Sequence, residues 1–172
     1  MNKKIVMLAF VAVLATACGK KEETASAPAK PGATTAAAPA AAPLAVPASD
    51  DSNAWKQYLV QVAKANMGGI RSSPFMYYLP SQSVENFQEQ YDRQLENVTA
   101  GIARGVLPGN MLAFGSPESG KLGDLIVEAF KAAQPASMKG VRVLFIGSKE
   151  DQERVKAAIE PSGAEVVLHA ID

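Results

Sequence analysis

The feature that most constrains the fold is a pattern that occurs twice, in residues 111–119 and 143–151. In both copies an apolar run ends in Gly-Ser and is followed by residues that favour a helix. The distance between the copies matches one strand plus one helix, which is how parallel strands are connected. The pattern therefore predicts parallel strands joined by helices, although an architecture that repeats produces such a pattern by itself.

Three strands are expected in this part of the chain, at residues 110–114, 141–146 and 164–171. The segments between them place apolar side chains at helical spacing, at residues 122–130 and 155–159. Strands that alternate with helices favour a parallel sheet with right-handed connections. The order β-α-β-α-β thus predicts a parallel three-stranded sheet.

Two helices are expected before this sheet, at residues 53–66 and 84–104, with Ser52 and Ser83 as their caps. The aromatic segment between them, residues 71–80, is bracketed by prolines and is predicted to be irregular. The predicted fold class is therefore α/β. We expect a small, three-layer-like domain in which both N-terminal helices pack on the C-terminal three-stranded sheet.

The first residues have the features of a secretion signal. Lys3 and Lys4 precede an unbroken run of small and apolar residues, 5–17, which is too short for a lasting transmembrane helix. The run ends at Cys18, the only cysteine of the chain. This end resembles the signal of bacterial lipoproteins, which is cut before an invariant cysteine. The resemblance implies a signal peptide at residues 1–17, a diacylglyceryl group on the thiol of Cys18 and an acylated amino terminus.

The residue after the cysteine bears on the membrane. In Gram-negative members of that family, retention in the inner membrane typically needs Asp at this position, and here it is Gly19. The resemblance thus favours the outer membrane, facing the periplasm, if the cell is Gram-negative. Several acyl chains on Cys18 would make the lipid bilayer a lasting partner. The alternative is an ordinary secretory signal cut after Ala-Thr-Ala, residues 15–17.

A low-complexity segment separates the lipidated end from the rest. Residues 18–51 are dominated by Ala, Pro, Thr and Ser, and the regularly placed prolines prevent a long helix. We expect a disordered, partly polyproline-like tether. Residues 52–172 have a globular composition and a length typical of one domain.

Charge and side-chain counts exclude several classes of function. The 17 Lys and Arg residues balance the 17 Asp and Glu residues, so nothing electrostatic favours nucleic acid as a partner. With one Cys and one His we expect no intrachain disulfide, no metal site and no cofactor. Residues 115–122 are close to a phosphate-binding loop, but Leu122 stands where the hydroxyl that ligates magnesium is needed. No serine-hydrolase motif occurs, and we assign no catalytic residue.

Ser116 and Ser148 are the first candidate binding residues. Each follows the glycine that ends a predicted strand and begins a predicted helix, at the edge where open α/β sheets bind ligands. The free N–H groups at such a helix start can hold an anion. The simpler interpretation is helix capping, since Pro117 follows Ser116 and Asp151 comes three residues after Ser148.

Tyr77 and Tyr78 are the second pair of candidate binding residues. Tyrosines are enriched at interfaces, and a proline-bracketed segment presents them with little entropy to lose. The alternative is that Phe75, Met76 and Leu79 of this segment fill a gap in the core. In a compromise, Phe75 and Leu79 lie inside and both tyrosines outside. Replacing either tyrosine with alanine would then weaken partner binding without lowering the melting temperature.

Together these features favour a non-enzymatic function. We expect a membrane-anchored periplasmic lipoprotein whose α/β domain is a binding or adaptor module for another envelope component, a protein or the cell wall. The plan of anchor, tether and compact head is similar to that of outer-membrane lipoproteins that activate peptidoglycan synthases, a likeness that assigns no residue. One alternative is a small-ligand or anion binder that uses Ser116 and Ser148. Another is a cell-wall enzyme whose catalytic carboxylates come from separate elements.

Overall fold

The computed structural model describes residues 45–172. The expected signal peptide, Cys18 and most of the expected tether therefore lie outside the described residues. The described chain runs through α1 (Ser52–Ala65), β1 (Phe75–Tyr78), α2 (Phe87–Arg104), β2 (Met111–Gly115), α3 (Ser119–Phe130), β3 (Arg142–Gly147), α4 (Lys149–Ile159), the 3₁₀ turn η1 (Glu160–Ser162) and β4 (Glu165–Ala170). No helix within these residues is both long and apolar enough to cross a membrane.

The strands form one parallel four-stranded sheet in the order β1-β2-β3-β4. Neighbours in the sheet are thus neighbours in sequence, and α2, α3 and α4 each connect one pair. The predicted α/β class is confirmed, as are the three C-terminal strands. The predicted three-stranded sheet is wrong by one strand, because the segment expected to be irregular adds β1 beside β2.

β1 forms inside the aromatic segment because both prolines lie outside the paired residues. Pro74 precedes the first strand residue, Phe75, and Pro80 follows the end of the strand, so neither removes a donor from the ladder. Aromatic side chains also suit the pleated surface of a sheet. Tyr77 lies opposite Phe114 of β2 in the register, and this long-range pairing is what makes the segment a strand.

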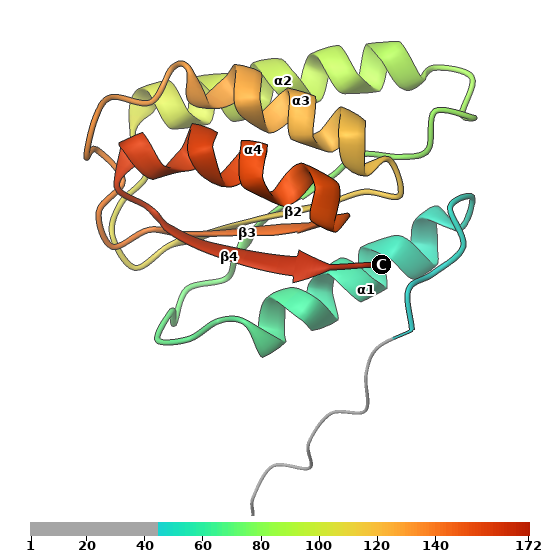
Figure 1. The fold of residues 1–172 in the computed structure, drawn as a ribbon, viewed down its shortest axis with the longest axis horizontal. Helices are drawn as coiled ribbons and strands as arrows, with labels where there is room; N and C mark the ends of the chain where they lie inside the picture. Colours follow the sequence, from blue (N-terminus) through green and yellow to red (C-terminus); the bar gives the residue numbers. More distant parts are fainter. Residues whose placement is uncertain (1–44) are drawn as a thin grey trace, which may run out of the picture. The chain divides into compact units, whose positions relative to one another are not determined.

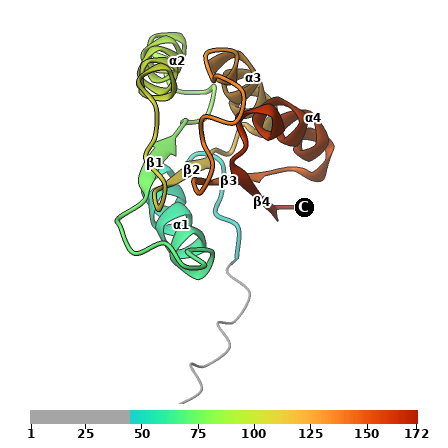
Figure 2. The ribbon, with the colours of Figure 1, turned by 90° about the vertical axis from the view of Figure 1, so that its left-hand side faces the viewer.

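Helices cover the two faces of the sheet unequally (Figures 1 and 2). Among the described helices, α2, α3 and α4 lie on one face, and only α1 covers the other. The two N-terminal helices therefore pack on opposite faces of the sheet. This arrangement makes three layers, with three helices, the sheet and one helix.

Each face has its own apolar core. In β2, Leu112 and Phe114 point to the three helices, while Met111 and Ala113 point to α1, as the alternation of a strand requires. The strand is fully buried because both faces are covered, which explains its unbroken apolar sequence. The core under α1 is the smaller one and consists of Trp55, Tyr58, Leu59, Val62 and Ala63 with Met111, Ala113, Leu144 and Ile146.

The second predicted helix is shorter than expected. α2 begins at Phe87 rather than at residue 84, and Ser83 does not cap it. The chain before it is held instead by the carboxylate of Glu118, which accepts the hydroxyl of Ser81 at 2.9 Å and the N–H of Gln82 at 3.0 Å. At its other end α2 stops after Arg104 as predicted, and the φ of 88° at the next residue, Gly105, favours glycine.

Candidate functional site

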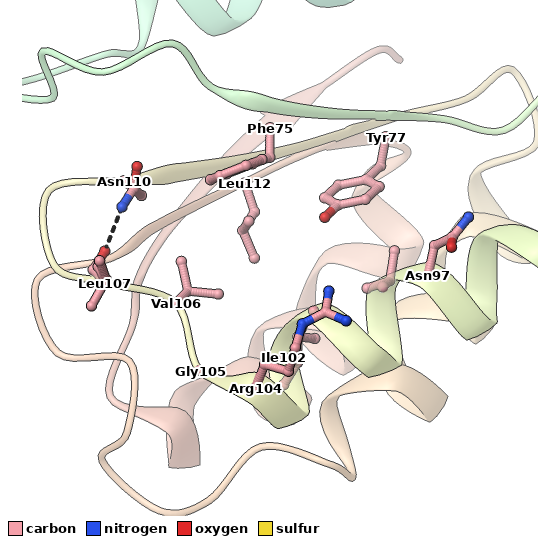
Figure 3. A pocket seen from close by; sticks show the side chains of 12 residues that line it. Phe75, Tyr77, Asn97, Ile102, Arg104, Gly105, Val106, Leu107, Asn110 and Leu112 are labelled. Atoms are coloured by element: carbon pink, nitrogen blue, oxygen red, sulfur yellow. Dashed lines mark hydrogen bonds between the residues drawn. The ribbon is translucent and has the colours of Figure 1, made fainter.

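The candidate site is a groove between the edge strand β1 and the C-terminal half of α2 (Figure 3). Its main hollow has a volume of about 420 Å³. β1 supplies side chains that point towards α2, and the loop after α2 closes one end. The residues that shape this hollow are Phe75, Tyr77, Asn97, Gly101, Arg104 and Leu107.

Two large apolar side chains lie uncovered at the mouth of the groove. Leu107 is 75% exposed and Phe75 is 50% exposed. Phe75 is exposed because β1 is an edge strand, and no other strand of the described part pairs beyond it. The loop that carries Leu107 is fixed by the side chain of Asn110, whose amide donates to the Leu107 carbonyl at 3.0 Å. Exposed apolar side chains around a hollow are typical of binding surfaces.

Tyr77 forms the inner wall of the groove. Its ring stacks on that of Phe114, with 4.9 Å between centroids and 15° between planes. Gly101 of α2 lies across from its hydroxyl, and a Cβ built at Gly101 meets only that oxygen, at 3.8 Å. The missing side chain at Gly101 therefore keeps the groove open, and a larger residue there would fill it.

A second hollow of about 290 Å³ continues the groove towards the carboxyl end of β1. It is lined by Tyr78, Gln90, Arg93, Gln94 and Asn97, and Asn97 lines both hollows. The Nε2 of Gln94 is buried and has no hydrogen-bond partner among the described residues. A buried donor without a partner is costly to the folded chain.

The groove is cationic. Arg104 lines the main hollow and Arg93 the second, whereas no Asp or Glu lines either of them. Arg93 lies 3.6 Å from Glu89 on the exposed surface, but Arg104 has no ion pair with any residue in 45–172. Burial raises the pKa of Tyr77, and the nearby charge of Arg104 opposes this effect. The groove therefore favours a ligand group with negative charge.

Tyr77 and Tyr78 point to opposite faces of the sheet. Tyr78 faces α1, where its hydroxyl donates to the Oγ of Ser52 at 3.1 Å and Lys56 Nζ lies 5.5 Å from its ring centroid. Ser52 is not the cap of α1. The cap is Asp51, whose carboxylate accepts the backbone N–H of Ala54 at 2.9 Å. Both tyrosines are half-buried, and burial raises the pKa of both hydroxyls. The two residues do not form one exposed pair.

Sequence reasoning missed most of the groove. Leu79 is buried, as the core-filling alternative requires, but Phe75 and Met76, which that alternative also places inside, are exposed. Leu107, Gly101 and Arg104 were not singled out at all. One available signal was Leu107, an apolar residue between Gly105, which ends the helix, and Pro108. Another was a set of polar or small residues at helical spacing on α2, namely Gln90, Gln94, Asn97, Gly101 and Arg104.

Ser116 and Ser148 lie at the carboxyl edge of the sheet, as predicted, but neither caps a helix through its side chain, since α3 begins only at Ser119 and no side-chain capping bond forms at Ser148. Ser116 is fully buried, and its Oγ accepts the N–H of Glu118 at 2.8 Å. Ser148 precedes the first residue of α4, and its N–H donates to the Oγ of Ser119 at 2.7 Å. The three connecting helices of the described part share one face, so this edge lacks the crevice between diverging connections at which open sheets bind ligands.

Carboxylates of the protein itself occupy these helix starts. Asp151 accepts the hydroxyl of Ser119 at 2.5 Å and two N–H groups of Arg154 at 2.6 and 2.8 Å. Burial acts to raise the pKa of Asp151, but these hydrogen bonds and the charge of Arg154 hold it below its ordinary value. At Glu118, too, burial acts to raise the pKa, but hydrogen bonds from Gln82 hold the pKa below its ordinary value. The helix N-termini thus already face negative charge.

His169 of β4 gives the packing of α1 a pH dependence. Its Nε2 lies 2.9 Å from the hydroxyl of Tyr58 on α1, and burial lowers the pKa of its imidazole. Because the folded pKa lies below the ordinary value of about 6.5, the unfolded chain binds the proton more readily. This contribution to stability is complete above the ordinary pKa and is lost as the pH falls towards the folded pKa.

We therefore expect the free energy of unfolding to decrease when the pH is lowered through about 6.5. Urea unfolding, followed by circular dichroism on either side of this value, measures the change. His169→Gln keeps a side chain able to bond Tyr58 but does not titrate, so the decrease should be absent from this variant. An equal decrease in the variant would assign the effect to other groups.

Comparison with protein-family models, with curated proteins and with solved structures gives no match to this chain. The resemblance to lipoprotein signals concerns Cys18 and the residues before it, which lie outside the described part. Within residues 45–172, no three His, Cys, Asp or Glu side chains gather as metal ligands do.

Proposed function

We propose that the chain is a lipid-anchored protein of the bacterial cell envelope whose domain binds another envelope component. The acylated Cys18 would hold it on the outer membrane, on the periplasmic side, and residues 18–51 would tether the domain to that surface. The binding surface is the groove between β1 and α2. In this role the protein is an adaptor rather than an enzyme.

The observation that carries the binding role is the pair of exposed apolar side chains at the groove. Phe75 and Leu107 flank a hollow with an apolar wall, and few polar side chains converge on it. Binding sites combine such an apolar hollow with a small number of polar groups that fix orientation. Burying Phe75 and Leu107 against a partner would remove apolar surface from water, which drives association.

The alternative of an anion or small-ligand site at Ser116 and Ser148 has less support. Ser116 has no exposed surface, and the carboxylates of Glu118 and Asp151 stand next to the same helix starts. An enzyme with dispersed carboxylates has no specific observation in its favour. Asp151 and Glu118 are engaged in hydrogen bonds that stabilise their charged forms.

Site-directed photo-crosslinking in intact cells tests the proposal. A benzophenone amino acid replaces Leu107 in the full chain, and its adducts are identified by mass spectrometry. We expect one recurrent envelope component at this position. The same probe at Val60, which is 36% exposed on α1, should not give that adduct.

Variants at Gly101 provide the matched control. Gly101→Leu fills the groove and should abolish the adduct, whereas Gly101→Ala adds a Cβ with only an ordinary contact at 3.8 Å and should retain it. Cys18→Ala should reduce the adduct by releasing the domain from the membrane. An adduct that survives Gly101→Leu, or that forms equally from Val60, would contradict the proposed site.

A further inference from the structure

The outer edge of β1 is open for pairing. Across the inner edge, the N–H of Leu79 donates to the carbonyl of Gly115 at 3.2 Å. Alternate residues of a strand direct their backbone groups to the same side, so the N–H and C=O groups of Met76 and Tyr78 point to the outer edge. No strand of the described part pairs with this edge. Unpaired edges of this kind are templates for an added strand.

The helix beside this edge offers groups suited to a peptide backbone. Gln90, Gln94 and Asn97 line the second hollow, and a side-chain amide both donates and accepts hydrogen bonds. Gly101 then leaves room for a side chain in front of Tyr77. The groove therefore has backbone partners on both walls and one apolar hollow.

The charge of the groove selects among peptides. Arg104 reaches into the main hollow between Tyr77 and the loop of Leu107 (Figure 3). Neither hollow has an acidic residue in its lining. A guanidinium without an ion pair in the described part is suited to a carboxylate, which it binds with two parallel hydrogen bonds.

We propose that the occupant of the groove is an extended peptide segment that bears a carboxylate. Its backbone adds to the open edge of β1 as a further strand, an apolar side chain enters the hollow formed by Phe75, Tyr77 and Leu107, and its carboxylate pairs with Arg104. The four residues of β1 match a segment of about four or five residues at the rise of a strand. This inference rests on the proposed function and specifies the chemistry of the partner.

A synthetic pool of peptides tests the inference, each about seven residues long so as to pair with all of β1 and with a free carboxyl terminus. The mature chain, purified in detergent, is incubated with the pool, and retained peptides are sequenced. We expect apolar sequences that carry a carboxylate and are not retained by Gly101→Leu. Hydrogen exchange at the amides of Met76 and Tyr78 should slow when such a peptide binds.

The carboxylate contact is tested on one retained peptide by fluorescence anisotropy. Arg104→Gln should raise the Kd about tenfold, and Lys131→Gln, which removes a positive charge outside the lining of both hollows, should change it little. If the carboxylate is the terminal one, amidating the peptide should raise its Kd for the unmodified chain about tenfold. Amidation should not change the Kd for Arg104→Gln, because that variant has already lost the contact. If the carboxylate belongs to an Asp or Glu side chain of the peptide, the same comparison is made with a peptide that carries Asn or Gln there.

Several outcomes overturn the inference. These are retention of no peptide above the Gly101→Leu background, unchanged amide exchange at β1, or equal binding by Arg104→Gln. A concentration-dependent dimer that Gly101→Leu dissociates would instead assign the groove to a second copy of the chain. The proposed function can hold when this inference fails, since a groove-dependent crosslink to an envelope polysaccharide would support a binding role and exclude a peptide as the occupant.

Discussion

Replacing Trp55 with alanine is expected to lower the free energy of unfolding by about 3–5 kcal/mol. Trp55 is 2% exposed and packs edge-to-face against Tyr58, with 5.6 Å between centroids. α1 is the only described helix on its face of the sheet, so loss of its largest side chain removes apolar contact from the smaller core, for which no other described helix can compensate. Urea unfolding followed by far-ultraviolet circular dichroism measures the loss, because the variant has no tryptophan fluorescence.

Trp55→Phe is the informative companion. The Nε1 of Trp55 is buried and has no hydrogen-bond partner among residues 45–172, so removing it deletes an unsatisfied donor. Phenylalanine keeps part of the apolar contact, and its cost should be well below that of alanine. Equal losses in the two variants would show that the indole nitrogen finds a partner in solution.

Replacing Tyr77 with alanine is expected to cost about 2–4 kcal/mol, from lost burial and lost ring stacking. The ring stacks on Phe114 and holds β1 against β2. Tyr77→Phe keeps the ring and should remain within about 1 kcal/mol of the original chain. Thermal and urea unfolding of the two variants measure both values.

This expectation replaces the one drawn from sequence, in which alanine at Tyr77 leaves the melting temperature unchanged. The ring faces inward, so partner loss in Tyr77→Ala would reflect damage to the fold as much as loss of contact. Gly101 and Leu107 are the better positions for testing the groove. If Tyr77→Ala unfolds at the same urea concentration as the original chain, the stacked ring contributes nothing to the sheet.

The sequence predicts the C-terminal strands and helices because their signals are local. A buried parallel strand is a continuous apolar run, and an amphipathic helix repeats within a few residues. β1 escapes this reasoning, because four aromatic and apolar residues between prolines become a strand only when Tyr77 meets Phe114. Which face α1 covers is likewise decided by tertiary packing, since its apolar stripe fits either face.

The groove was beyond prediction for the same reason. Phe75, Gly101 and Leu107 come from a strand, a helix and a loop, and nothing in their spacing brings them together. Residue type alone favours Tyr77 and Tyr78 as binding residues, but the exposed side chains of the groove are those of Phe75 and Leu107. A glycine near the C-terminal end of α2 is, from sequence alone, only a weak helix former, and its role in keeping the groove open is evident only from its position opposite Tyr77.

The consecutive order of the strands sets an assembly sequence for the domain. Each strand and its helix pack on the unit just before them, so β1 to β4 can be added one after another with short loop closures. α1 is the exception, because Tyr58 meets His169, 111 residues later in the chain. Of the described helices, α1 can therefore complete its packing only after β4 is in place, although it comes first along the described residues.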